Sequence, residues 1–145
     1  MNPSTNDQNS ETRKIEAYEV PHDARMGTLP RHFGRYMMTF EGFVYDLMRQ
    51  FSPQYAGGMW AYREVSNGSF YMIPPPDKTY RLVIRSNGFD GEMSADAAGI
   101  TVCLFAYSLL SFEHRGTEVF TGHFHGLRDF ALEHPESTQI FAAID

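Results

Sequence analysis

Residues 86–100 read SNGFDGEMSADAAGI and join a turn, a strand and the start of a helix within fifteen positions. The Asn87-Gly88 pair is typical of a tight turn, because both residue types tolerate positive φ angles. Ser94 is a preferred residue at a helix N-cap, and Asp96 suits the positive end of the helix dipole. The most apolar stretch of the chain follows directly. The segment therefore predicts a short strand and then a central core helix that ends near Phe112.

A β region is predicted before this segment. The Ser66-Asn67-Gly68 sequence indicates a hairpin turn between two strand-like runs, and the triple proline at 74–76 indicates a rigid loop before the next run. The predicted strands are residues 59–65, 69–73 and 80–85, with 89–93 as a possible fourth. These runs predict a small antiparallel β-meander of three or four strands.

Helices are predicted on both sides of the β region. Apolar residues recur with a period of about 3.6 between positions 36 and 51, which indicates one buried stripe of an amphipathic helix. Residues 29–34 are interpreted as a turn that leads into it. Further helices are expected at 117–133 and 136–144, separated by His134-Pro135. The predicted class is α+β, with the meander packed against about four helices.

Length and composition indicate one globular domain. The chain has 145 residues, of which 42% are hydrophobic, and we expect a disordered polar tail at 1–22 and a single domain at 23–145. No apolar run is long enough for a membrane helix, and the first residues lack the apolar core of a secretory signal. The single cysteine, Cys103, fits a reducing compartment. We therefore expect a cytoplasmic protein that is a monomer or a weak homodimer.

The net charge of −6 argues against two classes of protein. Sequence-independent binding to nucleic acid needs a basic surface, so we expect no stable DNA binding. A protein that imitates ten base pairs of duplex DNA needs about 20 negative charges, because DNA carries one charge per about 1.7 Å. The 18 acidic residues are also interleaved with 12 basic ones. Strong charge mimicry of DNA is therefore not expected.

Three carboxylates near the segment are the first candidates for a functional site. Asp90 and Glu92 lie on the same face of the predicted strand, where two carboxylates could bind a divalent metal or act as an acid–base pair. The plainer interpretation is structural, with Asp90 in a turn, Glu92 on an edge and Asp96 at a helix start. A metal-dependent hydrolase that uses Asp90, Glu92 and a histidine is kept as one alternative function.

Other constellations are weaker as sites. His123 and His125 are two positions apart on a predicted helix and cannot share a ligand face. Cys103 lies in an apolar helix, where burial raises the pKa of a thiol and makes it unreactive. The strand aromatics are Trp60, Tyr62, Phe70 and Tyr71, and with nearby arginines they could stack single-stranded bases. Alternation favours packing of this face on the helices, and a single-strand nucleic-acid binding module is the second alternative.

Asp145 is a further candidate contact. It follows an apolar helical turn at 140–144, so its carboxylate would lie at the negative end of a helix dipole. Such an arrangement is electrostatically unfavourable, and a basic partner would relieve it. The structural alternative is a solvated helix end.

Several segments taken together resemble the ArdB/KlcA antirestriction protein family. The matching segments are residues 29–34, 57–60, 66–72, 87–99, 127–130, 134–136 and 140–145. They occur in order and at similar spacing over residues 25–145. Each is weakly specific by itself, but the ordered set is specific.

The resemblance implies a small cytoplasmic α+β protein that plasmids and other mobile elements carry. It implies protection of incoming DNA from type I restriction–modification enzymes of the host, with no catalytic residue and no cofactor. The implied partner is the restriction complex, reached directly or through a host factor. Restriction subunits present basic DNA-binding surfaces, so the predicted partner contacts are Asp90, Glu92, Asp96 and Asp145.

Overall fold

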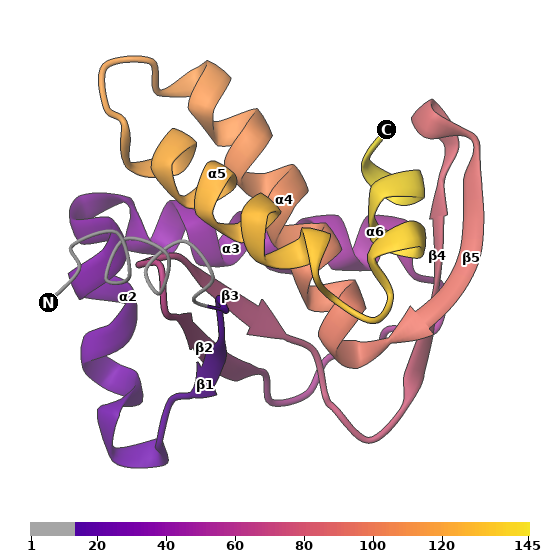
Figure 1. The fold of residues 1–145 in the computed structure, drawn as a ribbon, viewed down its shortest axis with the longest axis horizontal. Helices are drawn as coiled ribbons and strands as arrows, with labels where there is room; N and C mark the ends of the chain where they lie inside the picture. Colours follow the sequence, from indigo (N-terminus) through magenta and orange to yellow (C-terminus); the bar gives the residue numbers. More distant parts are fainter. Residues whose placement is uncertain (1–13) are drawn as a thin grey trace, which may run out of the picture.

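The computed structural model describes residues 14–145 and has an α+β architecture, as the sequence predicts. Two helices precede a run of four consecutive strands, and three helices follow that run (Figure 1). The elements are β1 (Ala17–Glu19), α2 (Arg25–Phe33), α3 (Met37–Phe51), β2 (Ala61–Val65), β3 (Phe70–Ile73), β4 (Thr79–Ile84), β5 (Phe89–Ser94), α4 (Ala95–Glu113), α5 (Val119–Leu132) and α6 (Ser137–Ile144).

Helix α4 forms the centre of the molecule. It packs against α3, α5, α6 and β3, and nearly every residue from Ala95 to Ala106 is buried. Ser94 caps its start, because the Ser94 side chain accepts a hydrogen bond from the backbone N–H of Ala97. Among the described residues, only this helix is long and apolar enough to cross a membrane, but 67% of that span is buried inside the fold. Both the cap and the core position predicted for this helix are confirmed.

Gly99 allows α4 to approach β3 closely. A Cβ atom at this position would lie 2.2 Å from the backbone oxygen of Met72 and 3.0 Å from the Cα of Ile73. No side chain can occupy that space, because both nearby atoms belong to backbone. The contact is extended by Cys103, whose sulfur accepts a hydrogen bond from the N–H of Met72 at 3.4 Å. Glycine at this position therefore sets the distance between the central helix and the sheet.

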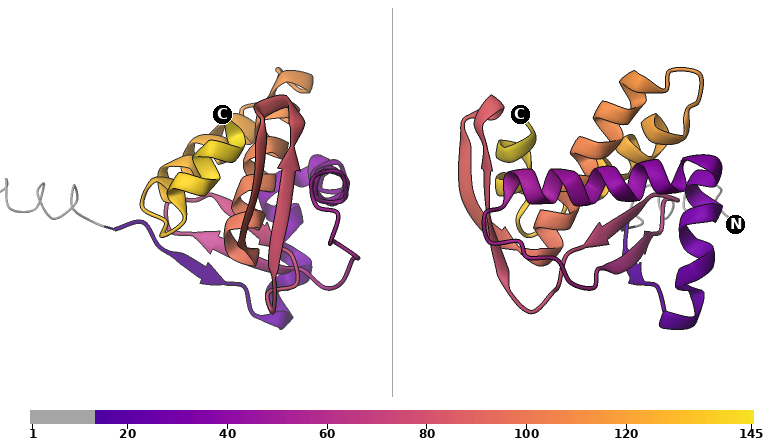
Figure 2. Two further views of the ribbon diagram at one scale, coloured as in Figure 1. Left: turned by 90° about the vertical axis from the view of Figure 1, so that its right-hand side faces the viewer. Right: turned by 180° about the vertical axis from the view of Figure 1, so that it is seen from behind.

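The strands form two sheets rather than one meander. One sheet has the order β1-β2-β3, and the other is the two-stranded ribbon β4-β5, both antiparallel. The prediction of one continuous meander is wrong in this respect, because the loop with the triple proline carries the chain from β3 into a separate ribbon. Figure 2 shows this ribbon at one end of the molecule, beside α6 and the end of α3.

Two expectations near the N-terminus also need correction. Residues 17–22 do not belong to the disordered tail predicted for 1–22, because β1 pairs with β2 over Ala17–Glu19 and the chain continues into a helical turn at His22–Ala24. Disorder predicted for residues 1–13 falls outside the described residues. The turn predicted at 29–34 is the second half of α2, which contains Pro30 and ends at Gly34 with a φ of 52°. The sequence did not indicate this helix because Pro30, a residue type that favours turns, lies inside it.

The remaining elements follow the sequence closely. Helices α3, α5 and α6 lie within a few residues of their predicted bounds, and the Asn67-Gly68 turn joins β2 to β3 as expected. Trp60, Tyr62, Phe70 and Tyr71 are all buried. This burial confirms that the aromatic face packs on the helices, and it removes the exposed stacking surface that a single-strand binding module needs.

Candidate functional site

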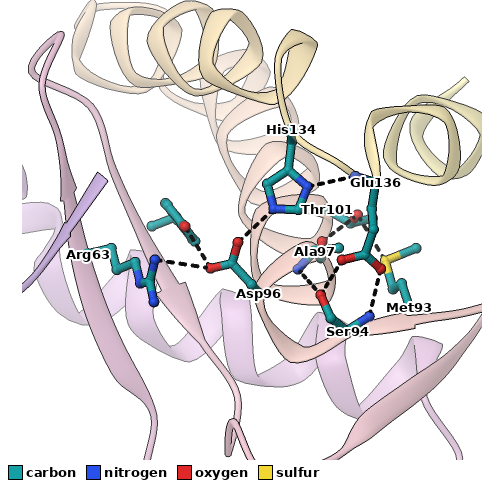
Figure 3. A network of polar contacts seen from close by, with 9 residues as sticks. Arg63, Met93, Ser94, Asp96, Ala97, Thr101, His134 and Glu136 are labelled. Carbon is teal, nitrogen blue, oxygen red and sulfur yellow. Dashed lines mark hydrogen bonds and ion pairs between the residues drawn. The ribbon is translucent and has the colours of Figure 1, made fainter. Parts of the chain in front are cut away.

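A polar cluster ties the start of α4 to four other parts of the fold. We call it the junction network, and it consists of Arg63, Tyr71, Ser94, Asp96, His134 and Glu136. Figure 3 shows the Asp96 carboxylate between Arg63 of β2 and His134, which precedes α6. Because the cluster joins β2, β3, β5, α4 and the α5–α6 connection, it fixes how the sheet and the helices meet.

Asp96 is the central acid of this network. Its Oδ1 accepts a hydrogen bond from the Tyr71 hydroxyl at 2.7 Å and lies 3.8 Å from Nη1 of Arg63, and its Oδ2 lies 2.7 Å from Nε2 of His134. Burial by itself raises the pKa of Asp96, but the hydrogen bonds from His134 and Tyr71 outweigh it and hold the pKa below its usual value. Asp96 therefore stays ionised inside the fold.

Glu136 closes the other half of the network. Its Oε1 accepts the backbone N–H of Ser94 at 2.9 Å, and its Oε2 accepts the Ser94 hydroxyl (Figure 3). The backbone N–H of Glu136 in turn donates to Nδ1 of His134 at 3.0 Å. The His134-Pro135-Glu136 connection thus holds the last residue of β5 and the first turn of α4 together.

The outer face of the β4–β5 ribbon carries two of the predicted contacts. Arg81 of β4 holds Asp90 of β5 through two hydrogen bonds of 2.8 and 2.7 Å, and both side chains are about half exposed. The hydrogen bonds and charge of Arg81 lower the pKa of Asp90. Glu92 accepts a hydrogen bond from the Thr79 hydroxyl at 3.0 Å. Asp90 and Glu92 therefore share one exposed face, as the strand pattern predicts.

Asp145 lies near the tip of the same ribbon. Asn87, in the turn between β4 and β5, donates a hydrogen bond to the backbone oxygen of Ala143 at 2.8 Å. This bond holds the last turn of α6 against the turn of the ribbon, and Asp145 is exposed. Of the four predicted contacts, Asp90, Glu92 and Asp145 thus gather at one end of the molecule, whereas Asp96 lies apart in the junction network.

A second polar cluster is buried among aromatic rings and was not foreseen from the sequence. Nε2 of His32 lies 2.7 Å from Oε1 of Glu64, and the rings of His32 and His123 are 4.9 Å apart. His123 stacks on Tyr107, and burial lowers the pKa of His123 to about 4. In the sequence, His32 lay in a predicted turn and His123 in a predicted helix, and neither pattern says that the two side chains meet.

The histidine cluster does not form a nucleophile–base pair. The Ser69 hydroxyl lies 3.3 Å from Nδ1 of His123, but it donates to the backbone oxygen of His123 at 2.8 Å. A histidine with its pKa lowered to about 4 is a weak base near neutral pH. Burial raises the pKa of Cys103 to about 12, as expected for an unreactive thiol.

A metal site finds no support in the geometry of the described residues. Within residues 14–145, no group of three histidine, cysteine, aspartate or glutamate side chains could hold a metal ion. Asp90 is engaged by Arg81 and Glu92 by Thr79, with no histidine in contact with either carboxylate. The metal-dependent hydrolase therefore lacks its third ligand in this fold.

Four carboxylates within residues 14–145 form ion pairs with arginines. The paired carboxylates are Asp46, Glu64, Asp90 and Asp96. The nitrogen–oxygen distance is longest, 3.8 Å, for Asp96 and Arg63. A DNA mimic presents carboxylates at the regular spacing of phosphates with few cations among them. The interleaving seen in the sequence therefore persists in three dimensions.

Comparison with known proteins gives a consistent result. The family described as "Antirestriction protein" matches residues 53–145. Two Escherichia coli proteins named antirestriction protein KlcA are similar to this chain. The first is 39% identical and covers 94% of this chain and 99% of the relative, and the second is 40% identical and covers 90% and 94%.

A solved structure agrees with the sequence comparison. It superposes with a TM-score of 0.84 at 40% identity and covers 92% of this chain and 99% of its own. That structure is described for the KlcA and ArdB proteins, with a novel fold and antirestriction activity against type I DNA restriction systems in vivo but not in vitro.

Proposed function

Because this chain belongs to the antirestriction protein family that includes KlcA, we propose that it inhibits DNA cleavage by type I restriction–modification enzymes of the host. The observation that carries the proposal is similarity over nearly the whole chain to KlcA and ArdB, with a TM-score of 0.84. The protein would protect incoming plasmid or mobile-element DNA in the cytoplasm. It would act as a monomer or weak homodimer, without catalysis and without a cofactor.

The proposed route is a contact with protein rather than imitation of DNA. A net charge of −6 and the pairing of acids with arginines both support this route. The KlcA and ArdB proteins are described as active in vivo but not in vitro. Such a difference favours a component of the living cell that purified reactions lack, such as a host factor that links this protein to the restriction complex. Direct contact with the restriction complex is the alternative route.

The proposed contacts are the four carboxylates Asp90, Glu92, Asp96 and Asp145. Three of them lie at the ribbon end of the molecule and are exposed, where a basic surface of a restriction subunit could reach them. Asp96 is half-buried in the junction network, so its effect on a partner would pass through the position of α4. The exposed trio and Asp96 therefore need separate tests.

The test is plating of unmodified phage on cells with an active type I system that express the protein. Combined Asp90→Ala, Glu92→Ala and Asp145→Ala substitutions should abolish protection and leave the circular dichroism spectrum unchanged. Asp46→Ala is the matched control, because Asp46 is exposed and also forms an ion pair with an arginine, Arg49 at 2.6 Å. Full protection by the triple variant would overturn the assignment of these contacts.

A further inference from the structure

A groove runs along the outer edge of β4, on the side away from β5. The cavity has a volume of about 560 Å³. One wall is formed by the end of α3 and the turn that follows it, with Gln50, Phe51 and Pro53, and the other by β4 and the turn after it, with Arg81, Val83 and Arg85. We call this cavity the β4-edge groove. Figure 2 shows the end of α3 beside the ribbon, the two elements that contribute these lining residues.

The backbone of β4 is available along this groove. Each strand of a two-stranded sheet has one edge without a strand partner, and the N–H of Arg81 points out of the ribbon to the Gln54 side chain at 2.8 Å. Because strand residues alternate, the N–H and C=O of Val83 point the same way. No side chain among residues 14–145 donates to or accepts from Val83. Gln54 thus takes the place of one carbonyl that an added strand would supply.

The two edges of the ribbon differ. The free edge of β5 is covered by α6, and the Gln139 side chain donates to the backbone oxygen of Glu92 at 3.2 Å. The edge of β4 lies near the end of α3, and its one side-chain hydrogen bond among the described residues comes from the exposed Gln54. Strand β4 pairs with β5 in unbroken register from Thr79 to Ile84. Proline, a bulge or a covering helix usually protects an edge strand, and β4 contains neither of the first two.

The charge of the groove is opposite to that of the protein as a whole. No carboxylate lines the β4-edge groove, whereas each of the other four described cavities includes an aspartate or a glutamate. Arg81 shares its charge with Asp90, but Arg85 is exposed and forms no ion pair within residues 14–145. In a chain with net charge −6, this groove is lined by two arginines and by no carboxylate.

We propose that the β4-edge groove binds an extended acidic peptide segment of a partner protein by adding it as a strand to β4. The backbone of Arg81 and Val83 would hydrogen-bond the segment after Gln54 moves aside, and Arg85 would hold one of its carboxylates. An alternating edge of N–H and C=O groups matches a polypeptide backbone and not a nucleic acid. The inference concerns a different surface from the exposed carboxylates and holds independently of the proposed function.

The test uses the purified full-length chain and a fluorescein-labelled peptide that alternates glutamate with valine and threonine. Fluorescence polarisation should show saturable binding. The same peptide with lysine in place of glutamate should bind at least about tenfold more weakly, since a lost charge-assisted hydrogen bond corresponds to about 1.5–3 kcal/mol. N-methylation of alternate peptide bonds should abolish binding, because it removes the donors that a strand needs.

Three variants and two control variants separate strand addition from a nonspecific charge effect. Arg85→Glu should weaken binding by about tenfold or more, and Arg115→Glu, an exposed arginine at the far end of α4, should leave it unchanged. Val83→Pro removes only an outward N–H, which an edge strand tolerates, and should also weaken binding. Gln54→Ala removes the competing side chain and should tighten binding, with Gln139→Ala as its control on the other edge.

Four results would overturn the proposal. These are equal binding of the acidic and lysine peptides, unchanged binding by Arg85→Glu with its fold intact, weaker binding by Gln54→Ala, and displacement of the peptide by oligothymidylate at lower concentration than by unlabelled peptide. Sedimentation of the chain alone tests whether a second copy of the chain occupies the β4 edge. A dimer that Val83→Pro dissociates would show that a second copy of the chain occupies the edge.

Discussion

The two halves of residues 86–100 meet opposite surroundings. The second half enters α4, where Gly99 lies against the backbone of β3 and no space is left for a side chain. The first half forms β5 in the ribbon, where alternate side chains point to water and are held by Arg81 and Thr79. Close packing restricts which residues can occupy the core half. The surface ion pair in the ribbon half contributes little to stability, so its residues can be used for contact with a partner.

The largest expected effect is Gly99→Ala. A methyl group would clash with the backbone oxygen of Met72, so α4 and β3 must separate, and we expect a loss of about 3 kcal/mol or more of unfolding free energy in urea. Gly42→Ala in α3 is the control, because its Cβ meets no atom within 4 Å and alanine favours a helix. Equal stability of the two variants would show that the position of Gly99 tolerates a side chain and that the core half is not tightly packed there.

The next effect is a dependence of stability on pH through His123. Burial lowers the pKa of folded His123 to about 4, whereas the unfolded value is about 6.5. The unfolded state therefore binds more protons between these values, and stability falls as the pH drops from about 7 to about 4, by about 3 kcal/mol in total. His123→Phe keeps the ring stacked on Tyr107 and should flatten this slope in urea unfolding. An unchanged slope would exclude His123 as its source.

A smaller effect is expected in the junction network. Asp96→Asn removes the charge that His134 and Arg63 face and should cost about 1.5–3 kcal/mol, the usual range for a lost hydrogen bond to a charged group. Because its folded pKa is lowered, the contribution of Asp96 is complete above about pH 4 and is lost as the pH falls further. Urea unfolding of both proteins should give stabilities that converge as the pH falls below about 4. A constant difference would place the effect in packing.

The smallest effect on stability belongs to the ribbon face. Arg81→Ala breaks an exposed pair with Asp90, and the midpoint of urea unfolding should stay within error of the wild type. Phage protection should nevertheless change, because Asp90 loses the arginine that holds it in place. A large drop in stability together with normal phage protection would show that the ribbon face stabilises the fold and does not contact a partner.

Local signals in the sequence were sufficient for much of the fold. The Ser94 cap, the apolar run of α4 and the 3.6-residue period of α3 are properties of contiguous residues, and all three predictions are confirmed. Features that depend on distant contacts were missed. Strand β1 exists because it pairs with β2 more than forty positions away, and α2 contains a proline that favours a turn in isolation.

The candidate site shows the same division. The shared face of Asp90 and Glu92 follows from the alternation of a strand and could be predicted. Their engagement by Arg81 and Thr79 depends on the register of β4 against β5. The meeting of Asp96 with His134, and of His32 with His123, depends on how helices far apart in the sequence pack together, and no local pattern encodes it.

The central claim is protection against type I restriction, and one plating experiment tests it most directly. Unmodified phage is plated on two hosts that differ only in the endonuclease subunit of a type I system, each with and without this protein. We predict that the protein raises plating on the restricting host towards that on the host without the subunit, and has no effect on the latter. Unchanged plating on the restricting host, with folded protein present in the cells, would contradict the account.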